Sequence, residues 1–250
     1  MNAFDKTLEL TQDNWGSAVV MDFTDMTLSP NPGSPAVEVT GETTQDAALR
    51  FRGQRVCVLN FASGVNPGGG VRHGAKAQEE ALCMCSGLLH GLETHLDYYK
   101  ANRADDAPID CYDRLIWSEG VPLIRDGYLN LTETMPIQVI TYPAPNVWKR
   151  EYIGGGEFVQ RAGLQEAARA TFERRCRHIV RRAANDGTEV LVLGAWGCGA
   201  YGNDPEIVAQ AFKGALDEQS GSIKRVVFAI YTRKTEDHQN QQPFREAFGV

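Results

Sequence analysis

The stretch that decides the fold is VCVLNFASGVNPGGGVRHGAKAQEE, residues 56–80. It begins with a short apolar, β-branched run at residues 56–61, which is typical of a buried strand in an α/β sheet. A loop of small and polar residues follows and ends in the triplet Gly68-Gly69-Gly70. Beyond Gln78, apolar residues recur at three- and four-residue intervals, as on one face of an amphipathic helix. This order predicts that the loop lies beyond the carboxyl ends of the strands, where open α/β sheets bind ligands.

The spacing within this stretch indicates a chemistry. Seven residues separate Gly70 from the cluster Gln78-Glu79-Glu80. Glycines let backbone approach a bulky anion without interference from Cβ, and the paired carboxylates can be delivered to the same ligand. We therefore expect a phosphate-bearing substrate and an acid catalyst. Taken singly, the triplet is more often a flexible turn, and the two glutamates could merely stabilise a helix start by roughly 0.3 to 1 kcal/mol.

The rest of the chain predicts an alternating α/β architecture. Further strands are expected at residues 19–23, 37–40, 137–142, 190–193 and 226–231, and helices at residues 45–51, 78–96, 158–184 and 205–218. Thr43 or Thr44 would cap the first helix, and Asp204 followed by Pro205 would cap the last. Such alternation predicts one domain with a sheet sandwiched between helices.

Composition restricts the possible partners. The chain has 250 residues and a formal net charge of -7, which argues against a broad electrostatic footprint on DNA. An anionic ligand must then be held locally, and backbone N–H groups of glycine loops can do this. One basic cluster lies on a helical pattern and is interpreted as a solvated helix face; it consists of Arg174, Arg175, Arg177, Arg181 and Arg182.

Cysteine spacing and the termini give the remaining expectations. The six cysteines match no metal-binding spacing, so we expect buried, reduced thiols and no metal. Residues 1–10 have no apolar core typical of a signal peptide, and no run reaches the roughly 18 apolar residues of a membrane span. We therefore expect a cytoplasmic protein that does not contact a membrane.

Three stretches together carry a family resemblance. They are residues 60–80, the strand and loop ITYPAPN at residues 140–146, and the loop GAWGCGAYGNDP at residues 194–205. With these motifs the chain resembles the bacterial-type poly(ADP-ribose) glycohydrolases, a branch of the macrodomain fold. The resemblance runs from about residue 38 to residue 231. It implies a three-layer α/β/α domain with a mixed, mostly parallel sheet, in which residues 1–250 form one catalytic domain with an N-terminal extension.

The resemblance also implies roles for single residues. Glu80 would be the catalytic acid and then the base toward water, Glu79 would hold the ribose hydroxyls, and Gln78 would position the ligand or the loop. Contacts to ADP-ribose are expected along all three motifs; these residues are Asn60, Ser63, Gly68, Gly69, Gly70, Asn146, Gly197, Cys198, Gly199, Ala200 and Tyr201. Tyr201 has the alternative role of a core anchor. Glu38 and Glu42 lie where an adenine contact is plausible, and no cofactor is expected.

Three functions remain open at this stage. The first is a glycohydrolase that releases ADP-ribose from poly(ADP-ribose), free or attached to protein. The second is a hydrolase of other linkages, such as single ADP-ribose units or acetylated ADP-ribose. The third is a module that binds ADP-ribose without turning it over, which would have no need of Glu80.

Overall fold

The structure is a computed structural model that describes residues 2–24, 26–103, 113–147, 164–232 and 239–250. Its strands are β1 (Ser17–Asp22), β2 (Ala36–Thr40), β3 (Val56–Phe61), β4 (Arg114–Arg125), β5 (Leu131–Tyr142), β6 (Val190–Leu193) and β7 (Arg225–Ala229). Its helices are α1 (Ala3–Thr11), α2 (Thr44–Leu49), η1 (Val71–His73), α3 (Gln78–Cys85), α4 (Leu88–Glu93), α5 (Leu96–Arg103), α6 (Leu164–Asn185), α7 (Pro205–Gln219) and α8 (Gln242–Phe248).

The strands form one mixed sheet. It has seven strands in the order β1-β4-β5-β3-β6-β7-β2. From β5 to β2 every neighbouring pair is parallel, whereas β4 runs antiparallel to both β1 and β5. β3 therefore lies near the middle of the sheet, and its carboxyl end is flanked by those of β5 and β6. The predicted α/β fold class with a mostly parallel sheet is confirmed.

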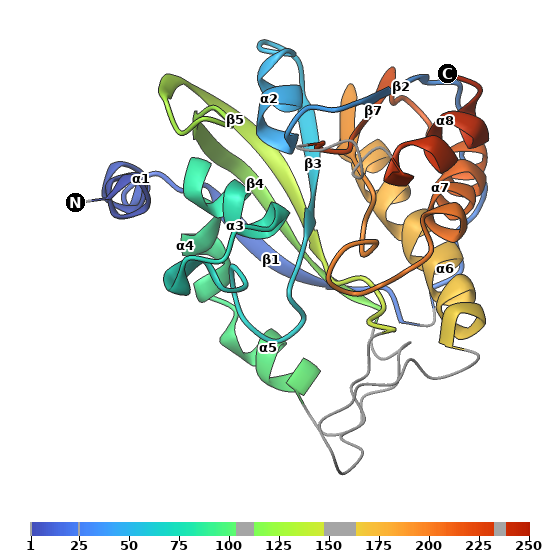
Figure 1. Ribbon diagram of the computed structural model, residues 1–250, viewed down its shortest axis with the longest axis horizontal. Coiled ribbons are helices and arrows are strands. Elements are labelled where there is room, and N and C mark those ends of the chain that lie inside the picture. Colours follow the sequence, from blue (N-terminus) through green and yellow to red (C-terminus); the bar gives the residue numbers. More distant parts are fainter. Residues whose placement is uncertain (1, 25, 104–112, 148–163, 233–238) are drawn as a thin grey trace.

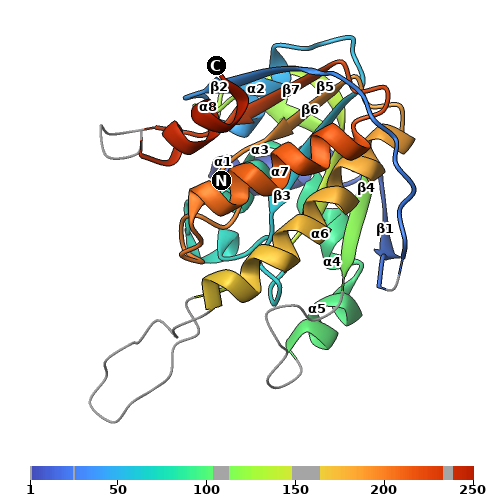
Figure 2. The same ribbon diagram turned by 90° about the vertical axis from the view of Figure 1, so that its right-hand side faces the viewer.

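Helices cover both faces of this sheet, and Figure 1 shows α6, α7 and α8 on one side and α2 to α5 on the other. Alternate residues of β3 divide between two buried clusters, as the two-residue period of a strand requires. Cys57 and Leu59 pack toward α6, α7 and α8, whereas Val56 and Val58 pack toward α2, α3 and α4. Figure 2 shows α6 and α7 side by side across their face of the sheet. These are the three expected layers.

Two predicted helix caps are present. The Thr43 side chain accepts a hydrogen bond from the Asp46 N–H at the start of α2, and the Asp204 side chain accepts one from the Glu206 N–H at the start of α7. Both satisfy an N–H that has no partner within the helix. Because α7 begins immediately after the second glycine loop, its cap also fixes where that loop ends.

The predicted single helix at residues 78–96 is wrong, since the chain breaks there after Cys85. Ser86 has extended backbone angles, with φ -145° and ψ 171°, and pairs in a bridge with Leu123 of β4. Its hydroxyl donates to the Leu82 carbonyl oxygen at 2.7 Å, which ends the helix by replacing a backbone bond. Three short helices, α3, α4 and α5, therefore wrap over the sheet where one long helix would extend past it.

β4 has no counterpart among the predicted strands. Its register with β5 shifts between Ser118 and Val121, where Gly120 has φ 68° and forms part of a bulge. Pro122 lies past the last residue that β1 pairs, so its missing N–H leaves no ladder bond unmade on that side. The bulge and the proline interrupt the apolar pattern of this strand. β5 begins at Leu131, earlier than the predicted start at residue 137.

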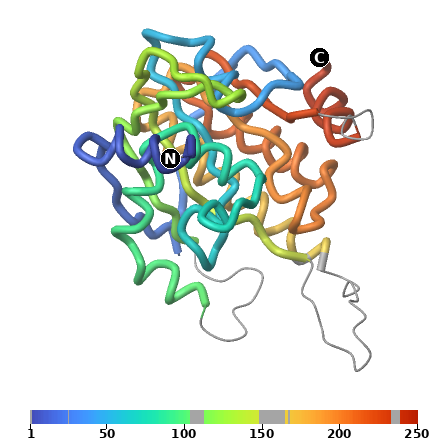
Figure 3. Tube along the Cα trace, turned by 60° about the vertical axis from the view of Figure 1, so that its left-hand side comes forward, coloured from blue at the N-terminus to red at the C-terminus, as the bar shows by residue number. Residues whose placement is uncertain are grey.

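The N-terminal segment packs on the domain through α1, which was not predicted. The Thr7 hydroxyl donates to the Met84 carbonyl oxygen at 2.9 Å and accepts from Arg125 Nε at 2.8 Å. His90 Nε2 lies 3.1 Å from the Leu8 carbonyl oxygen. Figure 3 shows α1, in dark blue, against the helices that follow the first glycine loop. The prediction of one domain over residues 1–250 stays a prediction.

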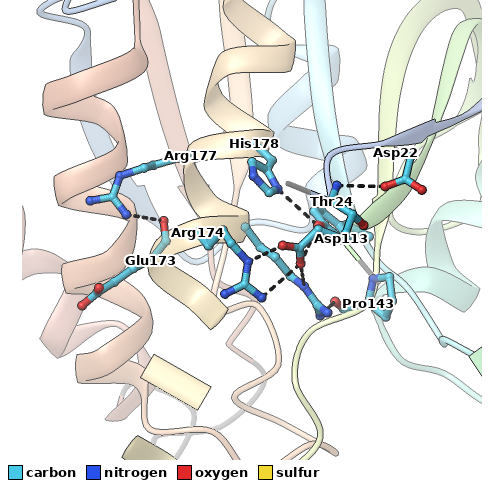
Figure 4. Close-up of polar contacts among 10 residues, drawn as sticks. Asp22, Thr24, Asp113, Pro143, Glu173, Arg174, Arg177 and His178 are labelled. Carbon is cyan, nitrogen blue, oxygen red and sulfur yellow. Dashed lines mark hydrogen bonds and ion pairs between the residues drawn. The ribbon is translucent and has the colours of Figure 1, made fainter. Parts of the chain in front are cut away.

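A buried ionic cluster joins α6 to the sheet, contrary to the prediction of a solvated basic face. Asp113 accepts hydrogen bonds from Arg174 (Figure 4) and, at 3.0 Å, from Nε of Arg175. Arg175 is only 3% exposed, lies over the Tyr142 ring, and donates from Nη1 to the Pro143 carbonyl oxygen at 3.0 Å. Burial raises the pKa of Asp113, but the hydrogen bonds from both arginines outweigh it, so the net pKa is lowered.

The same cluster holds a neutral histidine. The Tyr142 hydroxyl lies 3.4 Å from Asp113 Oδ1 and 3.4 Å from Nδ1 of His178. Burial lowers the pKa of His178 to about 4, with Arg174 and Arg175 adding to this effect against the charge of Asp113. The Phe23 ring stacks on His178 at 4.8 Å between centroids. The cluster therefore connects β1, β4, β5 and α6 immediately below the loop that starts at Pro143.

We expect Asp113→Asn to lower the free energy of unfolding by about 3 kcal/mol, because it removes the negative charge that faces the buried cation of Arg175. Urea denaturation measures this change. The matched control is Glu218→Gln, which breaks the more exposed pair between Glu218 and Arg177 and should cost no more than about 1 kcal/mol. Equal losses of unfolding free energy in the two variants would show that the buried cluster stabilises the protein no more than an exposed ion pair does.

Candidate active site

A cavity of about 1060 Å³ lies at the carboxyl ends of β3, β6 and β7. Most of its lining comes from five segments, which are the first glycine loop with η1 and the start of α3, the start of α2, Gly127 with Leu129, the second glycine loop, and residues 229–231; Met84, Glu93, Ala144 and Asn240 complete it. It therefore occupies the position that the doubly wound topology assigns to ligands. Both glycine loops and both predicted carboxylates meet there.

The first glycine loop needs its glycines because the chain folds back against the carboxylates. Gly68 and Gly69 have φ of 67° and 59°, a left-handed conformation that costs other residues roughly 1–2 kcal/mol. A Cβ on Gly69 would lie 2.4 Å from Oε1 of Glu80 and 3.0 Å from Oε2 of Glu79. The triplet thus brings backbone onto both carboxylates, and the two side chains converge on one point of the cavity wall.

Glu80 is held at both oxygens by backbone. Its Oε1 accepts from the Gly70 N–H at 2.8 Å, and its Oε2 accepts from the Ala77 N–H at 3.0 Å. The side chain stands in the first turn of α3, is only 7% exposed and still lines the cavity. Two charge-assisted hydrogen bonds fix its orientation without covering it from a ligand.

Glu79 is buried more deeply than Glu80. Its Oε1 accepts from Asn60 Nδ2 at 3.2 Å and its Oε2 from the Ser63 N–H at 2.7 Å. Burial raises its pKa to about 8, the nearby charge of Glu80 adds to the rise, and these hydrogen bonds oppose it. At neutral pH the Glu79 carboxyl is therefore mostly neutral, which reduces the repulsion between adjacent carboxylates.

Gln78 connects the first glycine loop to the sheet. Its Oε1 accepts from the Phe61 N–H at 2.9 Å, and its Nε2 donates to the Leu59 carbonyl oxygen at 2.8 Å and to Thr44 Oγ1 at 3.0 Å. These bonds use its whole amide, so among the predicted roles of Gln78 they favour positioning of the loop. Its placement as a ligand contact stays a prediction.

The second glycine loop approaches the cavity from the other side. Trp196 is fully buried and donates from Nε1 to the Tyr142 carbonyl oxygen at 3.1 Å. Gly197 has φ 79°, and a Cβ there would lie 2.6 Å from Ala144 Cβ. Within the described residues, the N–H groups of Gly199 and Ala200 have no hydrogen-bond acceptor. Such free N–H groups in a loop that precedes a helix are suited to a diphosphate.

Tyr201 spans from the second loop to the first. Its hydroxyl lies 3.4 Å from the Ala62 carbonyl oxygen, and its ring lines the cavity while packing against the α6–α8 core. Burial raises its pKa, so the phenol stays protonated. Both predicted roles, contact with a ribose and core anchor, are compatible with this position.

Asn203 supports the site and was not predicted. It is 3% exposed, and its Nδ2 donates to the Pro145 carbonyl oxygen at 2.7 Å and to the Gly197 carbonyl oxygen at 2.9 Å. It therefore joins the second glycine loop to the loop after β5. The only sequence signal was its place between Gly202 and the helix cap Asp204, which marks a turn but not a bridge.

The predicted site residues divide into those that line the cavity and those that do not. Those that line it are Ser63, Gly69, Gly70, Gln78, Glu79, Glu80, Gly197, Gly199, Ala200 and Tyr201. Asn60 lies behind Glu79, Gly68 packs on Leu89, Cys198 turns its thiol toward the Trp196 carbonyl oxygen, and Asn146 is exposed outside the cavity. Contact of these four with a ligand stays a prediction.

The remaining expectations concern adenine contacts, metal sites and membrane spans. Glu38 and Glu42 both pair with Arg50 and neither lines the cavity, so the structure brings no support to them as adenine contacts. Over the described residues no cluster of His, Cys, Asp or Glu could hold a metal ion. In the same part of the chain no helix is long and apolar enough to cross a membrane.

The cysteines of the described residues are free thiols. Cys57, Cys83, Cys85 and Cys176 are buried, and Cys198 is half-buried. Burial raises the pKa of each, and for Cys198 the charge of Asp204 adds to the rise. Cys111 lies outside the described residues.

We expect Gly69→Ala to destabilise the protein more than Gly53→Ala, as measured by urea denaturation. Gly53 has φ 83° with nothing within 4 Å of a built Cβ, so alanine there adds only the left-handed strain of about 1–2 kcal/mol. Alanine at position 69 has the same strain and must also displace the Glu80 carboxylate, which adds roughly 1.5–3 kcal/mol from a lost charged hydrogen bond. Similar losses of stability at the two positions would contradict the close contact between the Gly69 backbone and the Glu80 carboxylate.

Glu79 should give the protein a pH-dependent stability. Between its ordinary pKa of 4.5 and about 8, the folded protein holds a proton that the unfolded chain has released. The free energy of unfolding therefore falls as pH rises through this window, by up to about 1.4 kcal/mol per pH unit. We expect Glu79→Gln, which cannot titrate, to flatten this part of the profile, and Glu218→Gln to leave it in place. Parallel profiles for wild type and Glu79→Gln would disprove the raised pKa.

Comparisons with known proteins give the same family from sequence and from structure. A family model described as the microbial-type PARG catalytic domain, where PARG is poly(ADP-ribose) glycohydrolase, matches residues 9–126. No curated protein matches the chain in a sequence search.

Solved structures extend the likeness over nearly the whole chain. Poly(ADP-ribose) glycohydrolase from Thermomonospora curvata is 32% identical with a TM-score of 0.78, over 98% of this chain and 88% of that one. The enzyme from Deinococcus radiodurans in complex with ADP-ribose is 32% identical with a TM-score of 0.77, over 97% of this chain and 96% of that one. The Thermomonospora curvata enzyme bound to the inhibitor ADP-HPD is 33% identical with a TM-score of 0.76, over 99% and 87%. This chain belongs to the microbial-type poly(ADP-ribose) glycohydrolase family.

Proposed function

We propose that this protein hydrolyses the ribose–ribose glycosidic bonds of poly(ADP-ribose) and releases ADP-ribose. The observation that carries the proposal is the Glu80 carboxylate, which backbone N–H groups fix inside a cavity between two glycine loops. In a module that only binds ADP-ribose this carboxylate could anchor the loop, but it would have no need to line the cavity as well.

Glu80 acts on the departing oxygen. In the substrate complex a protonated Glu80 donates its proton to the ribose oxygen of the leaving unit as the bond from that oxygen to the anomeric carbon breaks, and positive charge develops on the remaining sugar. The resulting carboxylate then accepts a proton from water as the water oxygen bonds to the anomeric carbon. Each cycle therefore returns Glu80 to its starting state and consumes one water.

The neighbouring groups bind and orient the other unit, which carries the anomeric carbon and is released as free ADP-ribose. Glu79, mostly neutral at pH 7, can donate a hydrogen bond to a ribose hydroxyl while its other oxygen keeps the Ser63 N–H. The free N–H groups of Gly199 and Ala200 face the same cavity and bind the diphosphate. Tyr201 packs against the ribose next to the scissile bond.

The proposed partner is an ADP-ribose polymer, free or attached to protein. Direct contact with DNA or with a membrane is not part of the proposal. A cytoplasmic location and independence from cofactors stay predictions made from sequence.

We expect Glu80→Gln to lower kcat for release of ADP-ribose from labelled polymer by about 10² to 10⁴, because general acid–base catalysis contributes on this scale. Binding of ADP-ribose, measured by calorimetry, should persist, since glutamine keeps the size of the side chain. Glu218→Gln is the control for a lost carboxylate far from the cavity and should keep full activity.

The outcomes separate the candidate functions. A wild type that binds ADP-ribose but releases none from polymer would point to another linkage or to a binding module. Full activity of Glu80→Gln would refute the role of Glu80 while leaving the enzyme class in place.

A further inference from the structure

Three side chains rich in N–H donors stand on the segment between the glycine triplet and α3. Arg72, His73 and Lys76 are exposed and line the same cavity as the two carboxylates. We refer to these three residues as the basic rim. They are concentrated in five residues of a chain whose formal net charge is -7.

The hydrogen bonds of the site place the basic rim beyond Glu80. Tyr201 reaches the first loop at Ala62, next to Ser63, whose N–H holds Glu79. Glu80 in turn is held by Gly70 and Ala77, the two residues that flank the segment of the rim. These contacts connect the second loop to Glu79 through Tyr201, and they connect Glu80 to the segment of the basic rim. We take this succession as the order across the cavity, so that a unit bound on the second loop would have its scissile bond at the carboxylates and its leaving group on the rim side.

Lys76 differs from the other lysines in having no carboxylate partner. Among the described residues, Lys6, Lys100, Lys213 and Lys224 each form an ion pair with a carboxylate, whereas Lys76 forms neither an ion pair nor a side-chain hydrogen bond. Its ammonium group is free to meet an anion from outside the chain. Lysine serves well as a point charge for phosphate.

Arg72 is fixed in place beside it. Glu93 Oε1 accepts from Nε at 3.0 Å and from Nη2 at 2.6 Å, and the guanidinium lies 6.0 Å from the centre of the Phe4 ring. The remaining N–H groups of Arg72 stay available on a side chain that is 53% exposed. The rim therefore offers one cation held by a carboxylate and one without a partner among the described residues.

We infer that the basic rim binds the diphosphate of the leaving ADP-ribose unit, the next unit along the polymer. This inference rests on the proposed function and extends it to the recognition of a second unit. In the polymer the leaving oxygen belongs to an adenosine ribose that itself carries a diphosphate. An anion is thus present within a few bonds of the oxygen that Glu80 protonates. A single ADP-ribose unit attached to an uncharged group would have no such anion.

The test uses two substrates with the same scissile bond. One is a dimer of ADP-ribose units, whose leaving unit carries a diphosphate. The other is ADP-ribose linked to the ribose of plain adenosine, whose leaving group carries no phosphate. The variants are Lys76→Gln, which removes the charge, Lys76→Arg, which keeps it, and Lys224→Gln, which removes a lysine charge beside β7 at the opposite end of the sheet.

We expect Lys76→Gln to lower kcat/KM for the dimer about three- to tenfold through a higher KM, the size of one partly exposed phosphate contact. Its kcat/KM for the adenosine substrate and its affinity for ADP-ribose should equal those of the wild type. Lys76→Arg and Lys224→Gln should behave as wild type on both substrates. Added salt should reduce kcat/KM for the dimer less steeply in Lys76→Gln than in the wild type, because one phosphate contact is missing.

Other results would overturn the inference in distinguishable ways. An unchanged kcat/KM of Lys76→Gln for the dimer would remove the rim as a binding site. An equal loss on both substrates would show that Lys76 acts only by shaping the loop around Glu80. Inactivity of the wild type on both substrates would remove the proposed function itself, and this inference with it.

Discussion

The pair of hydrogen bonds from Gly70 and Ala77 to the Glu80 carboxylate is the constraint on which the site depends. Because the two donors stand at either end of the η1 segment, one side chain closes that segment into a loop. The closure places Gly69 against both glutamates, which leaves no room for a Cβ. It also sets the start of α3, and with it the Gln78 amide that meets the end of β3. The proposed catalytic group is thus at the same time the anchor of its own loop.

Two adjacent glutamates can share one cavity because their surroundings differ. Glu79 is enclosed, and the cost of burying its charge raises its pKa toward 8. Glu80 keeps contact with the cavity and receives two backbone N–H groups. These different surroundings suit two chemically identical side chains to the two proposed roles, ligand binding for Glu79 and proton transfer for Glu80, as in other paired carboxylates of enzymes.

The parts predictable from sequence were those with local signals. The parallel strands β3, β6 and β7, the caps Thr43 and Asp204, and the glycine-carboxylate motif all have a pattern within a few residues. The break at Ser86 could not be predicted, because it is made by a bridge to Leu123, far away in the sequence. The same holds for Asn203 and for Arg175, whose roles come from the Pro145 and Pro143 carbonyl oxygens of another loop. Long-range hydrogen bonds to loop carbonyl oxygens produce no periodic pattern in the sequence from which they could be predicted.

The cysteine in the second glycine loop has a consequence for the conditions under which the protein works. Peroxides and disulfides react with thiolates, and burial beside Trp196 keeps the Cys198 sulfur protonated. The other described cysteines are shielded in the same way. The loop proposed to bind the diphosphate thus carries a sulfur that is held in its less reactive, protonated form. Packing alone therefore lowers the reactivity of the described thiols toward oxidants.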